Sequence, residues 1–327
     1  MNKKWIVVMI LVFVLAISTA CNGGGKEAEE QVDVTFILDW VPNTNHTGLY
    51  VAKEKGFFEE EGLNVTIIEP AMESASQVVA SGKAEFGISS QDELTVARST
   101  GIPIVSVAAV IQDHTSGFAS PVEKGIMSPA DFEGKTYGGW GSPLEEAMIS
   151  TLMEAEGADP STVNNITVGT ADFFVNTKRD IDFQWIYYGW TGVEAETRNE
   201  DIHMIYLTDI DPVFNYYAPV IMTSEAVIEN KPELVEKFLR AVSKGYDFAI
   251  ADPEEAAAIL IEATPEANEE LIIASQKWLS QKYKGDAEKW GIQSETIWNN
   301  FSEWMLEHGV IEEQVDAKDA MTTQFLP

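Results

Sequence analysis

The chain contains very little cysteine and histidine. Its 327 residues include one cysteine, Cys21, and four histidines scattered along the sequence. A single cysteine excludes an internal disulfide, and no cysteine or histidine has the spacing of a zinc site. We therefore expect neither a metal nor a cofactor.

Positive charge is also scarce. Lys and Arg number 21 against 53 Asp and Glu, which gives a formal net charge of −32. Such a surface repels nucleic acid and anionic lipid head groups, so both are poor candidate partners. We interpret the acidity as an adaptation of the surface, of the kind that suits an alkaline or saline exterior, and not as a binding device.

The N-terminus has an apolar run that is too short for a membrane span. Lys3 and Lys4 open the chain, residues 5–17 are apolar and uncharged, and residues 18–20 are small. A spanning helix needs about 20 apolar residues, whereas a basic start, a shorter apolar run and a small-residue site are typical of a secretory signal. We expect residues 1–20 to be a cleaved signal peptide.

Cys21 follows this signal at once, which resembles the bacterial lipoprotein signal. Ser18 departs from that pattern, which has Leu three residues before the cysteine. We expect lipid on Cys21, a flexible tether over residues 21–31, and a protein anchored to the outer face of the cell membrane. The alternative is ordinary cleavage near Ala20, which would release a free protein.

Short apolar runs alternate with helical patterns along the mature chain. We expect strands at residues 34–38, 64–68, 86–89, 135–138, 163–168 and 183–188, and helices at residues 47–55, 76–81 and after Ser142. Ser142 and Glu145 form a capping box, with Pro143 at the first helical position. Strands and helices in this order predict an α/β fold with mostly parallel sheets and crossover helices.

The length favours two lobes. We expect residues 32–117 and 223–327 to form the first lobe and residues 118–222 the second, with crossings near Phe118 and Met222. Ligands of such sheets bind beyond the carboxyl ends of the strands, and this edge would face the cleft between the lobes.

Three segments carry a resemblance to a known family. They are Leu38–Ala52 (LDWVPNTNHTGLYVA) with the following KEKGFF and EGL, Ser81–Gly87 (SGKAEFG), and Phe238–Pro253. Together they resemble the family that contains the thiamine-pyrimidine precursor-binding proteins of ABC transporters and the fungal pyrimidine synthase. The resemblance implies a two-lobed clamp like the periplasmic binding proteins (type II). It also implies a monomer that captures a formylaminopyrimidine-type molecule outside the cell and delivers it to an ABC permease.

The enzyme branch of the family is a poor match. By alignment, Ser89 and Glu93 stand where the fungal enzyme has a Lys and a His for pyridoxal phosphate, and Phe214–Ala218 replace its cysteine cluster. We therefore expect no enzyme activity. No Gly-x-Ser-x-Gly or His-Glu-x-x-His motif suggests a hydrolase. Riboflavin, another heteroaromatic molecule or a sulfonate stay open as alternative ligands.

An aminopyrimidine needs flat surfaces for its ring and a polar group for its edge. Trp40 and Tyr188 are the best candidate shelves, because each lies where a predicted strand gives way to a loop, and Trp140 and Trp190 also lie near predicted strand ends. Any single aromatic can equally belong to the core. We expect Glu194 to bind the edge of the ring, with a solvated helix face as the alternative and Asp39 as its rival. The remaining predicted contacts are Asn43, His46, Ser89 and Gly139, with a helix-start role as the alternative for His46 and for Asp39.

The loop Gly139-Trp140-Gly141-Ser142 leads into a helix and could cradle an anion. Glu145 and Glu146 occupy the first turn of that helix and already satisfy its positive end. A phosphate or sulfonate would meet like charge there. This loop therefore favours a neutral or weakly basic ligand.

Overall fold

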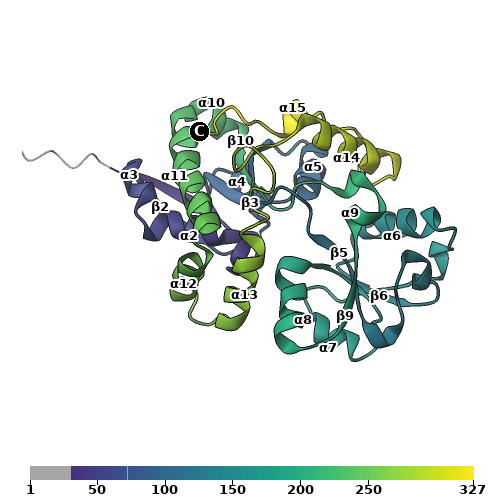
Figure 1. The fold of residues 1–327 in the computed structure, drawn as a ribbon. Coiled ribbons are helices and arrows are strands. Elements are labelled where there is room, and N and C mark those ends of the chain that lie inside the picture. The colour runs from purple at the N-terminus through teal and green to yellow at the C-terminus, as the bar shows by residue number, and fades with distance from the viewer. Residues whose placement is uncertain (1–30, 72) are drawn as a thin grey trace, which may run out of the picture.

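Two α/β lobes lie side by side in the computed structural model, which describes residues 31–71 and 73–327 (Figure 1). The predicted signal peptide and the predicted lipid site Cys21 lie outside the described residues. The first lobe contains β1 (Val32–Ile37), β2 (Leu63–Ile68), β3 (Phe86–Ser89), β4 (Ile104–Ala109) and β10 (Val220–Ser224). The second lobe contains β5 (Ser116–Pro121), β6 (Thr136–Gly139), β7 (Asn164–Thr167), β8 (Gln184–Tyr187) and β9 (Ile202–Tyr206).

Helices cover both faces of each sheet. They are α2 (Thr47–Glu54), α3 (Phe57–Glu60), α4 (Ala75–Ala80), α5 (Gln91–Ser99), α6 (Pro143–Ala155), α7 (Phe173–Thr177), α8 (Val193–Arg198), α9 (Leu207–Ile210), α10 (Glu225–Asn230), α11 (Pro232–Ala251), α12 (Pro253–Ala263), α13 (Glu269–Leu279), α14 (Glu295–Glu307) and α15 (Ala317–Ala320). The expected capping box of Ser142 and Glu145 starts α6, and Gly56 follows α2 with a φ of 74°. Most predicted elements agree with these bounds to within one or two residues.

The strands of each lobe run mostly in one direction. The first sheet has the order β2-β1-β3-β10-β4, and only β10 is antiparallel to its neighbours. In the second lobe, β5 is antiparallel to both β8 and β9. Strand β6 pairs in parallel with β7. A parallel bridge between Tyr137 and Phe183 also joins β6 to the residue before β8. The reversed strand of each sheet is the one that arrives from the other lobe. Each of these two strands enters its sheet at the edge where the other strands end, so it must run antiparallel to them. The predicted fold class is confirmed.

A cluster of phenylalanines fills the core of the first lobe. The ring of Phe238, on α11, stacks on Phe36, Phe58 and Phe86 with centroid distances of 5.6, 5.5 and 4.0 Å. Phe238 is completely buried. This ring joins the long amphipathic helix to the sheet, and its burial is a main reason why α11 packs where it does.

The predicted lobe boundaries need two corrections. The chain crosses between the lobes just before β5 and just before β10. Phe118 and Met222, near which the crossings were expected, lie inside these two strands, because each strand starts as soon as the chain enters its lobe. Helix α14 was expected in the first lobe, but Phe301, Trp304 and Met305 pack in the core of the second. Trp298, one turn earlier, packs in the first. This helix therefore joins the two lobes.

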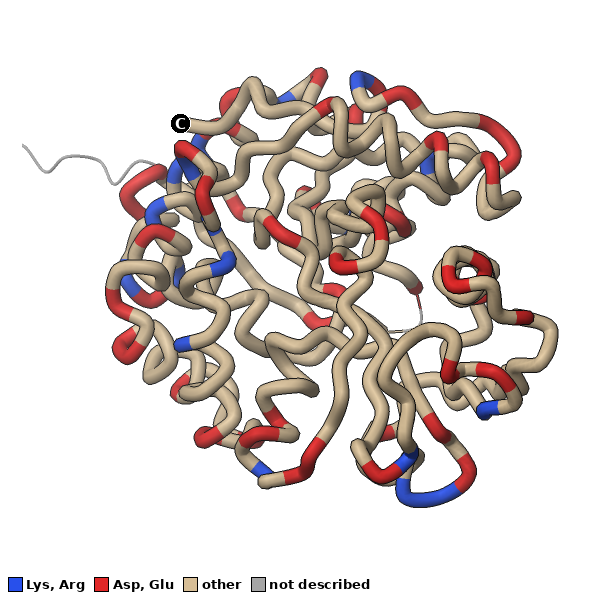
Figure 2. Tube along the Cα trace, turned by 45° about the vertical axis from the view of Figure 1, so that its right-hand side comes forward, with Lys and Arg blue, Asp and Glu red and all other residues tan. Residues whose placement is uncertain are grey.

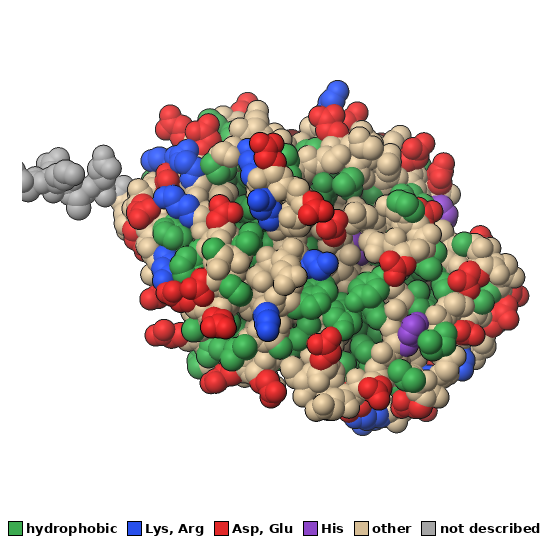
Figure 3. Space-filling view, in the orientation of Figure 1, with side chains coloured by type: hydrophobic (Ala, Val, Ile, Leu, Met, Phe, Trp, Pro, Cys, Tyr) green, Lys and Arg blue, Asp and Glu red, His purple; other side chains and the backbone are tan. Residues whose placement is uncertain are grey.

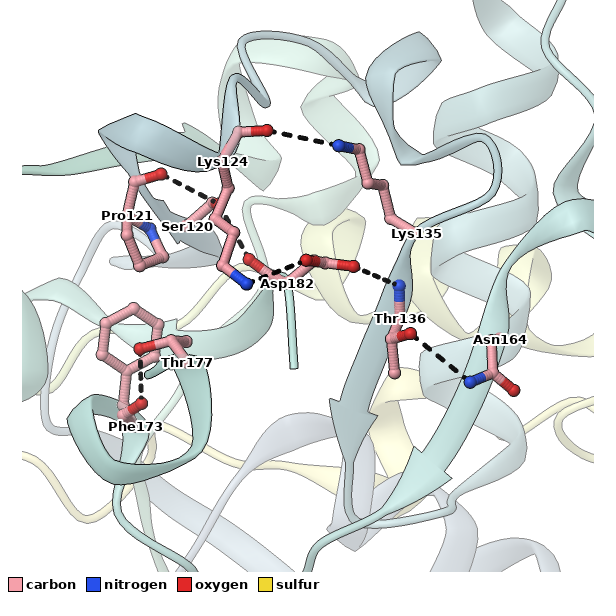
Figure 4. A network of polar contacts seen from close by, with 9 residues as sticks. All are labelled: Ser120, Pro121, Lys124, Lys135, Thr136, Asn164, Phe173, Thr177 and Asp182. Carbon is pink, nitrogen blue, oxygen red and sulfur yellow. Dashed lines mark hydrogen bonds and ion pairs between the residues drawn. The ribbon is translucent and has the colours of Figure 1, made fainter. Parts of the chain in front are cut away.

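A partly buried carboxylate fastens the sheet of the second lobe together (Figure 4). Asp182, just before β8, accepts hydrogen bonds from the backbone N–H of Thr136 at 2.9 Å and from Lys124 Nζ at 3.1 Å. Partial burial opposes its ionisation, but the bond from Thr136 and the charge of Lys124 outweigh it and hold the pKa of Asp182 below its usual range. The contact ties β6 to the segment that leads into β8.

Asp and Glu residues are scattered along the chain in both lobes (Figure 2), as expected for a net charge of −32. Within residues 31–71 and 73–327, no helix combines the length and the apolar character of a membrane span.

Candidate functional site

Three carboxylates meet at the carboxyl edge of the first sheet. Asp39 follows β1, and Asp92 and Glu93 lie in the first turn of α5, directly after β3. We call these three residues the acid triad. Their charges influence one another: burial, followed by the charges of Asp92 and Asp39, raises the pKa of Glu93 to about 7, although a hydrogen bond from Ser89 opposes the change. Burial also raises the pKa of Asp92. The predicted site residues Asp39 and Ser89 both belong to this cluster.

His46 and Asn43 hold Asp39 in place. The Nδ1 atom of His46 accepts the backbone N–H of Asn43 at 3.2 Å, so the proton of the neutral ring is on Nε2. That nitrogen donates to Asp39 Oδ1 at 2.8 Å. His46 is completely buried, and Asn43 caps the short 3-10 helix η1 (Thr44–His46). These two residues therefore position the carboxylate of Asp39.

A row of aromatic side chains faces the acid triad from the second lobe and the crossings. It consists of Trp140, Trp185, Tyr187, His114 and Tyr216, and its successive ring centroids lie 5.8, 6.3, 6.0 and 4.1 Å apart. We call this set the aromatic row. Burial and then the charges of Asp92, Glu93 and Asp39 raise the pKa of Tyr187, so this hydroxyl lies within electrostatic range of the three acids. Trp140 has an exposed fraction of 47% and is available as a shelf.

Hydrogen bonds fix the middle of the aromatic row. His114 Nδ1 donates to the carbonyl of Tyr216 at 3.0 Å, and its Nε2 therefore accepts from Ser116. Ser116 Oγ in turn accepts from Trp185 Nε1 at 2.6 Å. Burial lowers the pKa of His114 to about 4, so this ring is neutral at pH 7 and adds no positive charge to the cleft.

The loop Gly139-Trp140 is held by Glu145. This buried carboxylate accepts the backbone N–H groups of Trp140, at 3.0 Å, and Ser142, at 2.9 Å, and the hydroxyl of Tyr137, at 2.5 Å. The N–H groups that could cradle an anion are therefore already occupied. The expectation that Glu145 satisfies this helix start agrees with the structure.

The comparison with known proteins decides the family. The sequence pattern of the NMT1/THI5-like family matches residues 43–256, which is more than half of the 327 residues. The chain belongs to the NMT1/THI5-like family. It is 30% identical to the formylaminopyrimidine-binding protein of Halalkalibacterium halodurans, over 98% of this chain and 99% of that one. It is also 25% identical to the 4-amino-5-hydroxymethyl-2-methylpyrimidine phosphate synthase of Legionella pneumophila, over 90% of this chain and 92% of the enzyme.

The solved structures show the fold. The periplasmic aliphatic sulphonate binding protein SsuA from Escherichia coli matches with a TM-score of 0.70 and 13% identity, over 90% of this chain and 92% of that one. The family member therefore has the two-lobed fold of the periplasmic binding proteins.

The predicted contacts of this NMT1/THI5-like chain within residues 188–194 have their neighbours outside the acid triad and the aromatic row. Tyr188 donates to Glu196 and packs beside Tyr206 and Trp278, Trp190 packs against α12 and α13, and Glu194 pairs with Arg198 on its own helix. Tyr187 ends β8 and Tyr188 starts the π-helix that follows, and their rings have different neighbours: Trp185 and His114 for Tyr187, and Tyr206 and Trp278 for Tyr188. Sequence reasoning selected Tyr188 because it placed the end of β8 one residue too late.

The lobes touch at one edge of the cleft. Ser275, on α13, lies 2.6 Å from Thr44 Oγ1 and donates to the carbonyl of Gly189, in the π-helix η5 (Tyr188–Gly192) of the second lobe. A hollow of about 350 Å³ beside it is lined by Tyr206, Trp278 and Lys282, among others. Figure 3 shows apolar side chains gathered where the lobes meet on this face. The hollow contains no member of the acid triad.

The side chains that commonly bind metal ions are those of His, Cys, Asp and Glu. Among residues 31–71 and 73–327, no three His, Cys, Asp or Glu side chains come together in a way that could hold a metal ion. The acid triad is thus a set of interacting charges and has no metal-binding geometry.

Proposed function

We propose that this family member is an extracytoplasmic solute-binding protein. It captures a thiamine pyrimidine precursor of the formylaminopyrimidine type and delivers it to an ABC permease. The observation that carries this proposal is the acid triad facing the aromatic row across the cleft, because stacked rings and carboxylates are what a flat aminopyrimidine needs. The likeness to the formylaminopyrimidine-binding protein over nearly the whole chain supports the same ligand class.

The remaining parts of the proposal follow from the sequence. A lipid on Cys21 would anchor a monomer to the outer face of the cell membrane, with residues 21–31 as the tether and residues 1–20 removed. Ligand binding shifts the two lobes from an open to a closed arrangement, which the permease recognises. Ser89 and Glu93, in place of the Lys and His of the fungal enzyme, favour binding without chemistry. Asp39, Trp40, Ser89, Gly139 and Trp140 are the predicted contacts that we retain.

Isothermal titration calorimetry tests the ligand. We expect one-to-one binding of formylaminopyrimidine, with much weaker binding of thiamine. A sulfonate is disfavoured because Glu145 already occupies the N–H groups of Trp140 and Ser142. Heat with riboflavin or a sulfonate, and none with any pyrimidine, would overturn the ligand assignment.

Two neighbouring tyrosines provide a matched test of the site. Tyr187→Ala removes a ring of the aromatic row, and we expect the affinity for formylaminopyrimidine to fall by about tenfold or more, which is about 1.4 kcal/mol. Tyr188→Ala removes the same ring one residue later, on the side of Tyr206 and Trp278, and should change the affinity by less than about threefold. Titration of both variants checks this, and a larger loss from Tyr188→Ala would exchange the two roles.

A further inference from the structure

Among the residues that the structure describes, no Lys or Arg forms an ion pair with the acid triad. Asp39 meets only the ring of His46, which is neutral because its Nδ1 accepts a backbone N–H. Over the described part of the chain, no Lys or Arg forms an ion pair with Asp92 or Glu93, whereas Arg98, at the far end of α5, pairs with Glu225. Three carboxylates without a cation strongly attract positive charge and repel anions.

Two buried polar atoms near the triad also lack a partner. The hydroxyl of Tyr216 and the Oδ1 atom of Asp92 form no hydrogen bond within residues 31–71 and 73–327. Tyr216 is completely buried, and its pKa is raised by burial and by the charges of Asp92, Tyr187 and Glu93, so its hydroxyl lies within electrostatic range of these acids. Folded proteins seldom leave such atoms unpaired. Both atoms indicate a missing polar partner in the same place.

The groups around Glu93 come from four segments of the chain. Asp92 and Ser89 flank it on its own part of the chain, Asp39 faces it from the end of β1, Tyr187 faces it from β8, and Tyr216 lies on the second crossing. His114, which contacts both tyrosines, is neutral. The helix start of α5 stabilises one negative charge, and the raised pKa values of Asp92 and Glu93 reflect the cost of ionising all three acids together.

We propose that the acid triad binds the ligand as a flat organic cation of the amidinium type, with Glu93 as its counter-ion and the aromatic row against its ring. This inference rests on the proposed function, from which it takes a pyrimidine bound in this cleft. What it adds is the charge state of the bound pyrimidine. A protonated aminopyrimidine offers N–H donors along one edge, which is what carboxylate oxygens accept.

The proton comes from the site itself at neutral pH. Glu93, with a pKa of about 7, is partly protonated in the free protein. When a neutral, weakly basic pyrimidine enters, the O–H bond of Glu93 breaks and an N–H bond forms at a ring nitrogen, so that cation and carboxylate remain paired. No other reactant takes part. Above pH 7 the proton must come from solution, so the affinity should fall as the pH rises, toward a limit of about tenfold per pH unit.

Two probes of the same size and shape test the charge directly. 4-Aminopyridine is a cation at neutral pH, and aniline is its neutral counterpart. We expect 4-aminopyridine to quench the tryptophan fluorescence with an affinity about tenfold or more above that of aniline. Glu93→Gln should remove this preference. Glu229→Gln, which makes the same change of charge on the exposed helix α10, should keep it. Equal affinities of the two probes for the native protein, or an unchanged preference in Glu93→Gln, would overturn the proposal.

Formylaminopyrimidine itself separates this proposal from the proposed function. Calorimetry in two buffers of different ionisation enthalpy should show proton uptake at about pH 8.5, and Glu93→Gln should abolish it. Tight binding without proton uptake leaves the proposed function standing and contradicts the cation. If no pyrimidine binds but 4-aminopyridine is still preferred over aniline, the proposed ligand fails and the cation site stands.

Discussion

Replacement of Phe238 by alanine is expected to lower the free energy of unfolding by about 3–5 kcal/mol. The ring is completely buried and stacks on Phe36, Phe58 and Phe86, so its loss removes transfer free energy and leaves a cavity among three rigid rings. These rings belong to two strands and a helix that cannot close the gap without moving the sheet. Urea unfolding followed by circular dichroism measures the change.

Phe248→Ala is the matched control for this prediction. Phe248 lies on the same helix, but it is only partly buried, with the ammonium group of Lys55 4.5 Å from the ring centroid. Its loss should cost clearly less than that of Phe238, because water already reaches part of the ring. If both variants lost the same stability, the phenylalanine cluster would not be the main attachment of α11.

Much of the fold could be predicted from local patterns. Thr47–Glu54, Phe86–Ser89 and the capping box of Ser142 were expected within a residue or two, because turn formers and caps act over a few positions. The joining role of α14 could not be predicted. Its large apolar residues do not reveal that Trp298 packs in one lobe and Phe301 in the other.

The site was predicted only in part. Asp39 and Trp140 were selected because they lie near predicted strand ends, and Ser89 entered through the alignment with the fungal enzyme. The topology brings these strand ends to one cleft. Asp92 and Glu93 were not selected as site residues, since acids at a helix start usually serve only the helix dipole. Tyr188 was preferred to Tyr187 because the predicted strand gave way to a loop at residue 188, whereas β8 ends at Tyr187. The convergence of three acids from two strand ends is a property of the tertiary structure.

Glu145→Ala should have a second large effect, a loss of about 3–5 kcal/mol in the free energy of unfolding. The substitution leaves three donors without their acceptor: the hydroxyl of Tyr137 and the N–H groups of Trp140 and Ser142. Each buried donor that stays unpaired costs about 1–3 kcal/mol, and water recovers part of this at the loop. Glu146→Ala, on the exposed side of the same turn, should change stability by no more than about 0.5 kcal/mol.

An added carboxylate can separate the loss of these hydrogen bonds from a general loss of packing. In Glu145→Ala the vacated position is lined by three donors at a helix start, which is an anion site. Acetate, which has the size of the removed group, should therefore raise the midpoint of thermal unfolding of Glu145→Ala more than that of the native protein or of Glu146→Ala. Equal shifts in all three proteins would mean that the carboxylate of Glu145 does not occupy an anion cradle. Glu145 would then no longer disfavour a sulfonate ligand, while the acid triad would still favour a positively charged ligand.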